Sequence, residues 1–579
     1  MTSLDWFLVL AINGSIILVG LWLARGTRNS VDWFLAAKGL PWWMVGLSMF
    51  ATAVDSGDYV AVAGGAYDQG MAYISAWWLG LGVGWCLVSY IVFVPMYRAG
   101  MFTNAEYLEY RFGPAARVIS VLIQIQTRTN VMANVAMSLY LTFSIITGWG
   151  PSTWWMIVAI AAGAGVYTAM GGLRSVAVTD TMQSIVMLMA AVALWWTVWS
   201  AVGGWNGLEE KLSEHVAAER LAESTARAMT HVGSYDSTDV PSSLVVIGFI
   251  IVLSGYCVIN QSQAMRLLAA RSVWDMKMAA IVAAAVTAVV MWFNITLGIL
   301  GRAVVPDLER TDAIFPKLIE HFLPTMQAGL LGIVVAGLLA GGLSTYDSIG
   351  SALASVFTRD VYARFVVRSA NDHHYLTVSR IVTLLFIAIS FAYIPFLKLG
   401  MLAFYLKISG VAVVPLLAVY LMGVLTRAAR RSATVGLIAG ILCGATRFID
   451  PLLIGFGLDA LPVWWTNTWW GYLWSIAATV GAMLVTSMVV GWASREEVSG
   501  LTIWSSGTVS MREGRPRVDS SRGAADQPTW LETSRADVPV GPEYPVSQAQ
   551  RSIFWTRGPL VLAVLLLLVL GYLNVVVFW

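Results

Sequence analysis

Hydroxyl and carboxyl side chains interrupt an apolar segment of spanning length, residues 329–362. They are Ser344, Thr345, Asp347, Ser348 and Ser351. Polar groups at bilayer depth are costly, and in membrane helices they usually face a cavity or an ion path. Ser344, Thr345 and Ser348 share one helix face because they stand at i, i+1 and i+4. Oxygen ligands gathered on one face suit a small hard cation, so this segment predicts a cation-coupled transporter. The alternative for such hydroxyls is a bond back to the preceding helical turn.

A second apolar segment, residues 41–66, is interrupted in its middle by the sequence DSGD, residues 55–58. A continuous lipid-facing helix does not hold two carboxylates at that depth. Glycine and serine allow a helix to unwind where the freed carbonyls line a cavity. A broken helix of this kind is the expected place of an ion and substrate site. The alternative, a re-entrant or surface helix, is disfavoured by the length of the segment.

The composition is that of an integral membrane protein. Hydrophobic residues make up 58% of the 579 residues and charged residues 12%, against roughly a quarter charged in soluble domains. The 27 tryptophans are typical of rings at membrane interfaces. A net charge of +2 provides no footprint for nucleic acid. The spacing of the three cysteines, Cys86, Cys257 and Cys443, indicates neither a metal site nor a disulfide framework. We therefore expect them to pack as small hydrophobic side chains.

About fourteen apolar segments reach spanning length. They cover roughly residues 5–24, 41–66, 73–97, 117–147, 151–169, 176–203, 242–262, 276–304, 325–357, 377–399, 402–426, 433–455, 469–493 and 558–578. Loops rich in arginine and lysine alternate with poorer ones, which predicts both termini outside. Residues 204–241 are expected to form an external loop with a short helix. Residues 494–557 are expected to form a loosely ordered cytoplasmic tether, with regulatory docking as the alternative.

Five further motifs follow one another in a fixed order. They are FTNAEYLEYRFG (102–113), YTAMGGLRSVAVTDTMQ (167–183), NQSQAMRLLAARS (260–272), LSTYDSIGSALASVFTRDVY (343–362) and KISGVAVVPLLAVYLMGVLTR (407–427). Together they resemble the sodium/solute symporter family, which includes sodium-coupled galactose, proline, sialic acid and monocarboxylate transporters. The resemblance covers roughly residues 5–495.

This resemblance implies an all-α integral membrane protein with a LeuT-like core of two inverted five-helix repeats. The expected units are an extra N-terminal helix and first cytoplasmic loop (1–40), the first repeat (41–203), the external loop (204–241), the second repeat (242–426), additional helices (427–493), the polar segment (494–557) and a C-terminal helix (558–579).

A sodium site between the first and eighth core helices is also implied by the resemblance. Its expected ligands are the carbonyls of Ala53, Ser56 and Gly341 and the hydroxyls of Ser344 and Thr345. Sodium accepts neutral carbonyl and hydroxyl oxygens without needing many formal charges.

The resemblance further implies a second cation site at Asp180, Asp347 and Ser348. This chain has Asp347 where small hydroxyl residues also occur in the family. The second site is therefore expected to take either sodium or a proton. The alternative for Asp180 is a helix cap after Thr179.

Three residues are candidates for solute contacts. Tyr256 falls where the family's sugar transporters place an aromatic gate, with simple packing as the alternative. Arg128 can grip a carboxylate through paired hydrogen bonds or anchor a helix end at the interface. Asp58 can hold an ammonium group or pair with Lys407. Trp77 and Trp78 are assigned to the interfacial belt rather than to a vestibule.

These features predict a secondary active symporter, in which a sodium gradient drives import of a small polar organic solute by alternating access. Sodium and solute should then strengthen each other's binding. The alternative is a transporter-like sensor or receptor, but residues 494–557 are too short and polar for a signalling domain. No enzyme is expected, since the five histidines form no nucleophile–base pair or metal cluster. The expected partners are a small solute, sodium and the bilayer, in a bacterial inner membrane.

Overall fold

In the computed structural model, residues 1–24, 33, 36, 39–234, 240–322, 327–399, 401–448, 461–505 and 553–579 are described. Every regular element within these ranges is a helix, and one isolated bridge joins Leu40 to Ala270. Twelve helical stretches are long and apolar enough to cross a membrane. They are built on α1 (Ser3–Ala24), the run η3 (Ala76–Gly80), α5 (Leu81–Leu87), η4 (Val88–Val92) and α6 (Phe93–Arg98), then α8 (Pro114–Thr147), α9 (Thr153–Met170), α10 (Leu173–Val202), α13 (Ser242–Ile259), α15 (Val273–Val304), α17 (Leu330–Val356), α18 (Asp372–Ser390), α19 (Met401–Leu425), α23 (Thr468–Val490) and α25 (Ile553–Tyr572).

The expected number of fourteen spans is not confirmed, because two of the expected segments form shorter helices. The first of them is divided into α3 (Trp42–Ala53) and α4 (Ser56–Gln69). The other is α20 (Ser432–Ala445), and residues 449–460 beyond it lie outside the described ranges. Most of the polar segment 494–557 also lies outside them, so its expected role stays a prediction.

Shorter helices connect these spans. They are η2 (Gly70–Tyr73), α7 (Asn104–Phe112), η5 (Gly150–Ser152), α11 (Gly204–Ala217), α12 (Glu223–Ala228), η6 (Val232–Ser234), α14 (Gln261–Leu268), η7 (Thr311–Ala313), α16 (Ile314–Phe322), η9 (Phe357–Val366), η10 (Phe391–Leu399), η11 (Thr446–Phe448), α22 (Val463–Thr466), η12 (Ile503–Ser505) and η16 (Leu573–Val577).

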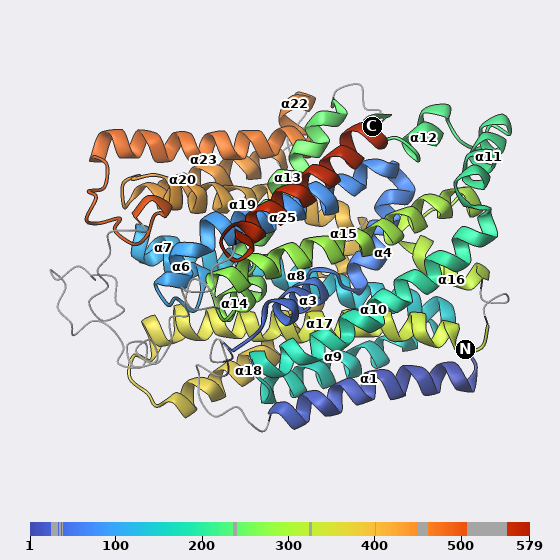
Figure 1. Cartoon of the computed structure of the whole chain (residues 1–579), viewed down its shortest axis with the longest axis horizontal. Coiled ribbons are helices and arrows are strands. Elements are labelled where there is room, and N and C mark those ends of the chain that lie inside the picture. The colour runs from blue at the N-terminus through green and yellow to red at the C-terminus, as the bar shows by residue number, and fades with distance from the viewer. Residues whose placement is uncertain are drawn as a thin grey trace.

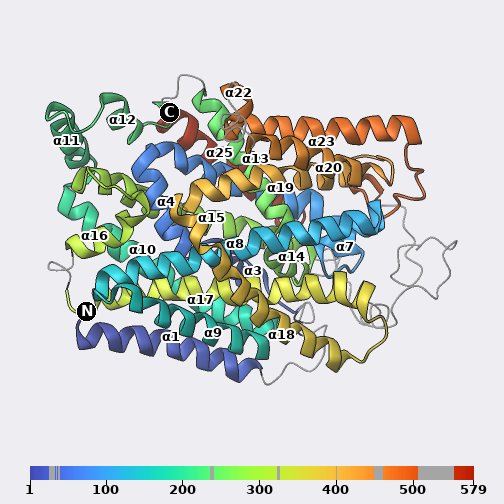
Figure 2. The same ribbon diagram turned by 180° about the vertical axis from the view of Figure 1, so that it is seen from behind.

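The long helices run side by side, with α1 and α9 along one edge and α20 and α23 along the opposite edge (Figures 1 and 2). Both termini lie at the same end of the bundle as α11 and α12. This placement agrees with the prediction that the termini and the loop 204–241 share one side of the membrane.

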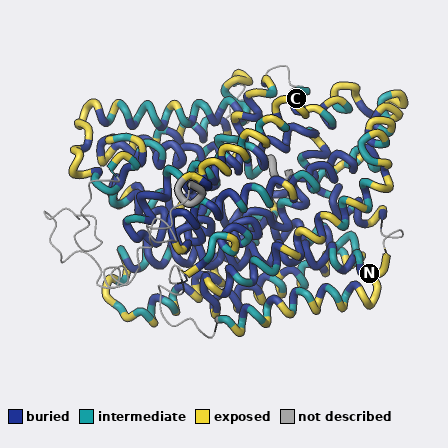
Figure 3. The backbone as a smooth tube through the Cα atoms, viewed as in Figure 1, coloured by how far each residue is buried: buried dark blue, intermediate teal, exposed yellow. Residues whose placement is uncertain are grey.

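Burial divides the helices into an outer ring and a central set (Figure 3). In α1 only 22% of the most apolar stretch is buried, and side chains such as Leu10 and Trp22 face outward, as they do on a lipid-facing helix. In α17 the buried share is 89%, and this helix packs against α1, α8, α9, α10 and α18. It therefore lies in the buried interior of the bundle, and its polar side chains are enclosed by protein.

The break between α3 and α4 is set by local hydrogen bonding. Val54 and Asp55 are extended, with φ of −116° and −123°. The Asp55 carboxylate accepts the Asp58 amide N–H, and the Asp58 carboxylate accepts the Asp55 N–H, each at 3.0 Å. This reciprocal capping box starts α4. A side chain at Gly57 would meet an Asp55 carboxylate oxygen at 2.8 Å and would displace it from the capping box. The predicted interruption of the helix is therefore present.

Candidate ion and solute sites

Glycines in α17 let its backbone approach the broken helix. A Cβ added to Gly341 would lie 3.3 Å from the amide nitrogen of Ser56. One added to Gly342 would lie 3.1 Å from a Leu139 methyl carbon and 3.3 Å from the Ser56 hydroxyl oxygen. Contacts of 3.0–3.4 Å are tighter than a side chain normally makes, so larger residues would push α17 away from the break.

Oxygen atoms of the two segments gather at this approach. The Ser344 hydroxyl oxygen lies 2.7 Å from the Ala51 carbonyl oxygen and 2.8 Å from that of Gly341. The Thr345 hydroxyl oxygen lies 3.4 Å from an Asp55 carboxylate oxygen. Carbonyls in the last turn of α3 have no helical N–H partner. The bond from Ser344 to its own preceding turn, raised above as an alternative, is therefore present together with the contact across to α3.

The Ala53 and Ser56 carbonyls stay predicted sodium ligands. Ala53 is the last residue of α3 and lines the solute cavity. Ser56 opens α4, and its hydroxyl accepts from Ser138 at 2.9 Å. The α3 carbonyl within hydrogen-bond distance of Ser344 is that of Ala51.

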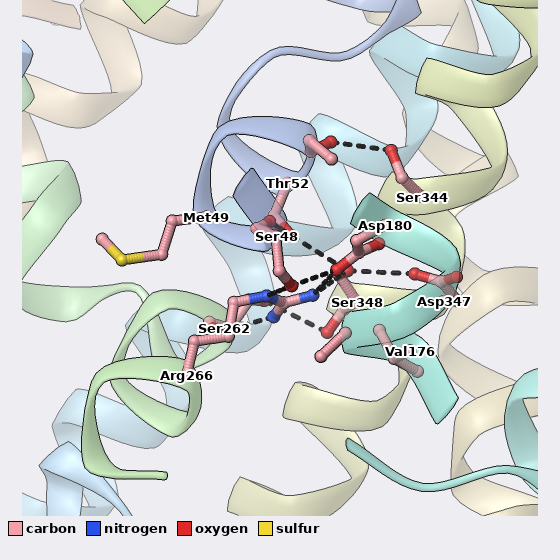
Figure 4. Close-up of polar contacts among 12 residues, drawn as sticks. Ser48, Met49, Thr52, Val176, Asp180, Ser262, Arg266, Ser344, Asp347 and Ser348 are labelled. Atoms are coloured by element: carbon pink, nitrogen blue, oxygen red, sulfur yellow. Dashed lines mark hydrogen bonds and ion pairs between the residues drawn. The ribbon is translucent and has the colours of Figure 1, made fainter. Parts of the chain in front are cut away.

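A guanidinium group lies among the three residues expected to form the second cation site (Figure 4). Arg266, from α14, places one nitrogen 2.6 Å from an Asp180 carboxylate oxygen and 2.5 Å from the Ser348 hydroxyl. Its Nε atom lies 2.6 Å from the Ser48 hydroxyl. Asp180 is inside α10 and fully buried, so the alternative that it caps a helix is wrong.

Asp347 completes this group from the side of α17. Its two carboxylate oxygens accept hydrogen bonds from the Tyr167 hydroxyl and from Ser348. Asp180, Asp347 and Ser348 therefore lie together, as expected. Arg266 was not predicted as part of this site, because it stands between two apolar segments where an arginine is ordinarily read as part of a cytoplasmic loop. Two buried carboxylates and one guanidinium leave one negative charge in the group when all are ionised.

A cavity lies beside the break, between α4, α8, α13 and α19. Its lining includes all three residues expected to contact solute, Asp58, Arg128 and Tyr256. Trp77 also lines it, and Trp78 is buried with its indole N–H donating to the Ala288 carbonyl at 3.0 Å. The assignment of these two tryptophans to the interfacial belt is therefore wrong.

Arg128 lies in the cavity wall, and two of its guanidinium nitrogens donate to no acceptor in the described part of the chain. It stands well inside α8 and is 4% exposed, so the anchor at a helix end is excluded. Its Nε and Nη1 atoms have no hydrogen-bond partner among the described residues. Its guanidinium carbon lies 5.2 Å from the centre of the Tyr256 ring. A buried donor without an acceptor is costly, so this group is suited to a ligand that supplies one.

Asp58 has no partner in Lys407. Lys407 is exposed, and its ammonium nitrogen lies 4.7 Å from the centre of the Phe448 ring. The pairing raised as an alternative for Asp58 is therefore absent.

Comparisons with known proteins agree with this geometry. The model of the sodium:solute symporter family matches residues 33–440. The human sodium/myo-inositol cotransporter 2 is 29% identical over 527 residues, which cover 84% of this chain and 77% of the relative. The rat sodium/glucose cotransporter 2 is 28% identical and covers 77% of this chain and 72% of its own length.

Two solved transporters share the fold. A Na+-coupled sialic acid symporter in a substrate-bound, outward-open state aligns with a TM-score of 0.69 at 22% identity, covering 85% of this chain and 99% of its own. A nucleobase-cation-symport-1 family transporter in a closed conformation gives 0.51 at 13% identity, covering 82% and 99%. The expected all-helical, LeuT-like fold is confirmed.

Proposed function

The chain belongs to the sodium:solute symporter family, and we propose that its transported solute has both a carboxylate and an amine. The protein is a multi-pass membrane transporter, not an enzyme, and it couples sodium to the movement of a small polar solute. The sensor alternative is not favoured. We also propose the plasma membrane, in a bacterium the inner membrane, as its location, since import driven by a sodium gradient requires that membrane.

One observation carries the solute class. The Arg128 guanidinium is buried at the cavity and lacks acceptors for two of its N–H-bearing nitrogens. A carboxylate matches its planar fork with two parallel hydrogen bonds. Asp58, which also lines the cavity, supplies the opposite charge for an ammonium group. The Tyr256 ring beside Arg128 forms part of the wall against which such a solute packs.

Sodium is assigned to the approach between α3 and α17. Its proposed ligands are the carbonyls of Ala53, Ser56 and Gly341 and the hydroxyls of Ser344 and Thr345, which are hard oxygen ligands of the kind that such a cation prefers. Support comes from Ser344 and Thr345, whose hydroxyls face the break at Ala51 and Asp55. Because these oxygens come from the broken helix and from α17, bound sodium holds the two together. Sodium thereby stabilises the outward-open state, and solute then permits closure.

The second cation is assigned to Asp347. Arg266 already compensates Asp180, so the remaining carboxylate is the one that takes sodium or a proton. The Ser348 hydroxyl donates to the Asp347 carboxylate and accepts from Arg266, which in turn pairs with Asp180. Ser348 therefore links the two acidic residues and completes the site.

A neutral sugar or polyol is the second candidate solute. It is favoured by the aromatic lining of the cavity and by the similarity to cotransporters of myo-inositol and glucose. Radiolabelled amino acids, monocarboxylates, sugars and polyols should be compared in proteoliposomes with an inward sodium or potassium gradient. Sodium-dependent accumulation of an amino acid supports the proposal. Accumulation of a monocarboxylate alone removes the amine, and accumulation of sugars or polyols alone overturns the proposal.

A further inference from the structure

Asp55 contacts both of the assigned sites. One of its carboxylate oxygens lies 3.4 Å from the Thr345 hydroxyl of the sodium site. The other accepts the amide N–H of Asp58, and Asp55 itself lines the solute cavity. The side chain is buried, with 4% of the residue exposed. Its position follows from the helix break, because the capping box fixes the carboxylate at the start of α4.

The charges around the cavity do not balance. Its lining contains two carboxylates, Asp55 and Asp58, and one cationic side chain, Arg128. When all three are ionised, one negative charge is left over in a buried space, which is unfavourable. Asn134 shares the wall, and its carbonyl oxygen likewise has no hydrogen-bond partner among the described residues. The cavity therefore offers both an unpartnered guanidinium and surplus negative charge.

We propose that Asp55 is a charged ligand of the transported sodium ion and links sodium binding to solute binding. This inference rests on the assignment of sodium to the approach between α3 and α17. Sodium beside Thr345 neutralises the Asp55 carboxylate. Arg128 is then drawn less strongly to the acidic side of the cavity, and its N–H groups are free for the solute carboxylate.

This arrangement also restricts the solute by charge. With sodium at Asp55, the cluster of Asp55, Asp58 and Arg128 is electrically neutral. A zwitterion or an uncharged solute leaves it neutral, whereas an anion or a cation adds a buried net charge. Of the two neutral classes, only a zwitterion also supplies opposite charges to Arg128 and Asp58, so it is the best electrostatic match to the sodium-bound cavity. Sodium and solute should then strengthen each other's binding by the same factor.

Substitutions at Asp55 must separate its charge from its capping role. Asp55→Asn removes the charge and keeps an oxygen that caps α4 about as well. Asp55→Ser keeps a shorter capping oxygen and serves as a second variant. Asp58→Asn is the matched control, because it removes a charge from the same capping box and cavity while Asp55 remains beside Thr345.

The test is equilibrium binding of ²²Na⁺ to the purified full-length protein without solute. We expect Asp55→Asn and Asp55→Ser to raise the dissociation constant for sodium about tenfold or more. Asp58→Asn removes charge from the cavity but no group beside Thr345, so it should raise this constant by a clearly smaller factor. An unchanged dissociation constant in both Asp55 variants, or an equal rise in Asp58→Asn, overturns the role of Asp55 alone. A wild-type protein that binds no sodium overturns the sodium site itself and this inference with it.

Discussion

The guanidinium of Arg266 lies 2.6 Å from an Asp180 carboxylate oxygen, with neither side chain more than 1% exposed. The pair joins α14 to α10, and the further bond from Arg266 to Ser348 adds α17. Three helices are therefore held at one buried charged group. The pair also distinguishes the two acidic residues of this group, because the charge of Asp180 is compensated by Arg266 and the charge of Asp347 is not.

Asp180→Asn should destabilise the protein strongly. It leaves the Arg266 charge buried without its counter-ion, which costs about 3–5 kcal/mol when one partner of a buried pair is removed. The double variant Asp180→Asn with Arg266→Met removes both charges and should recover much of that loss. Thermal unfolding of the purified full-length protein measures both. Equal losses in the single and double variants would show that the two residues are not coupled.

Asp347→Asn should lower the number of positive charges moved with each solute by one. The reason is that this carboxylate holds the charge that Arg266 leaves uncompensated. Reversal potentials of solute transport in proteoliposomes give the ratio, measured at two pH values so that a proton is distinguished from sodium. Ser351→Ala, one helical turn further along α17, is the control and should leave the ratio unchanged. An unaltered ratio and pH profile in Asp347→Asn removes this residue from ion coupling.

Arg128→Lys should weaken binding of a carboxylate solute by about tenfold or more, because lysine keeps the charge but loses the planar fork. The apparent affinity for the transported solute measures the effect. Arg302→Lys is the matched control, since Arg302 stacks 4.6 Å from the Tyr67 ring and does not line the cavity. Wild-type affinity in Arg128→Lys, or the same loss in Arg302→Lys, contradicts a direct contact with the solute.

Glu109 on α7 should make stability depend on pH. Burial raises the pKa of its carboxyl group, but the guanidinium groups of Arg117 and Arg364 lower it by more, so the pKa lies below its ordinary value of 4.5. A depressed folded pKa gives stability that is present above the unfolded pKa and lost as the pH falls through the folded one.

Glu109→Gln should therefore cost about 1–3 kcal/mol at neutral pH and flatten the acid limb below about pH 4.5. Unfolding temperatures of the wild type and the variant across pH 3–7 measure this. An acid limb of identical steepness in both proteins would refute the contribution of Glu109.

The sequence was informative where a polar residue stands in an apolar segment and cannot face lipid without a large cost. Asp55 and Asp58 predicted the broken helix, and the hydroxyls of Ser344 and Thr345 predicted the helix that faces it. The contacts between helices could not be predicted from the sequence, because pairs such as Arg266 and Asp180 join residues 86 positions apart.

The assignment of Arg128 shows the same limit. An arginine in a long apolar segment is compatible with a snorkelling anchor or with a buried ligand group. Only its depth within α8 and its unpartnered nitrogens distinguish the two. Its helix was predictable, but its direction toward the cavity depends on how α8 packs against α4 and α19.

The most direct measurement is the sodium concentration for half-maximal solute uptake in proteoliposomes containing wild type, Ser344→Ala or Thr345→Ala. Each variant removes one oxygen ligand and should raise that concentration by on the order of tenfold while the protein still folds. Ser355→Ala is the control, because its hydroxyl is buried in α17 but has no hydrogen-bond partner among the described residues. Half-maximal sodium concentrations equal to that of the wild type in both Ser344→Ala and Thr345→Ala would contradict sodium binding between α3 and α17.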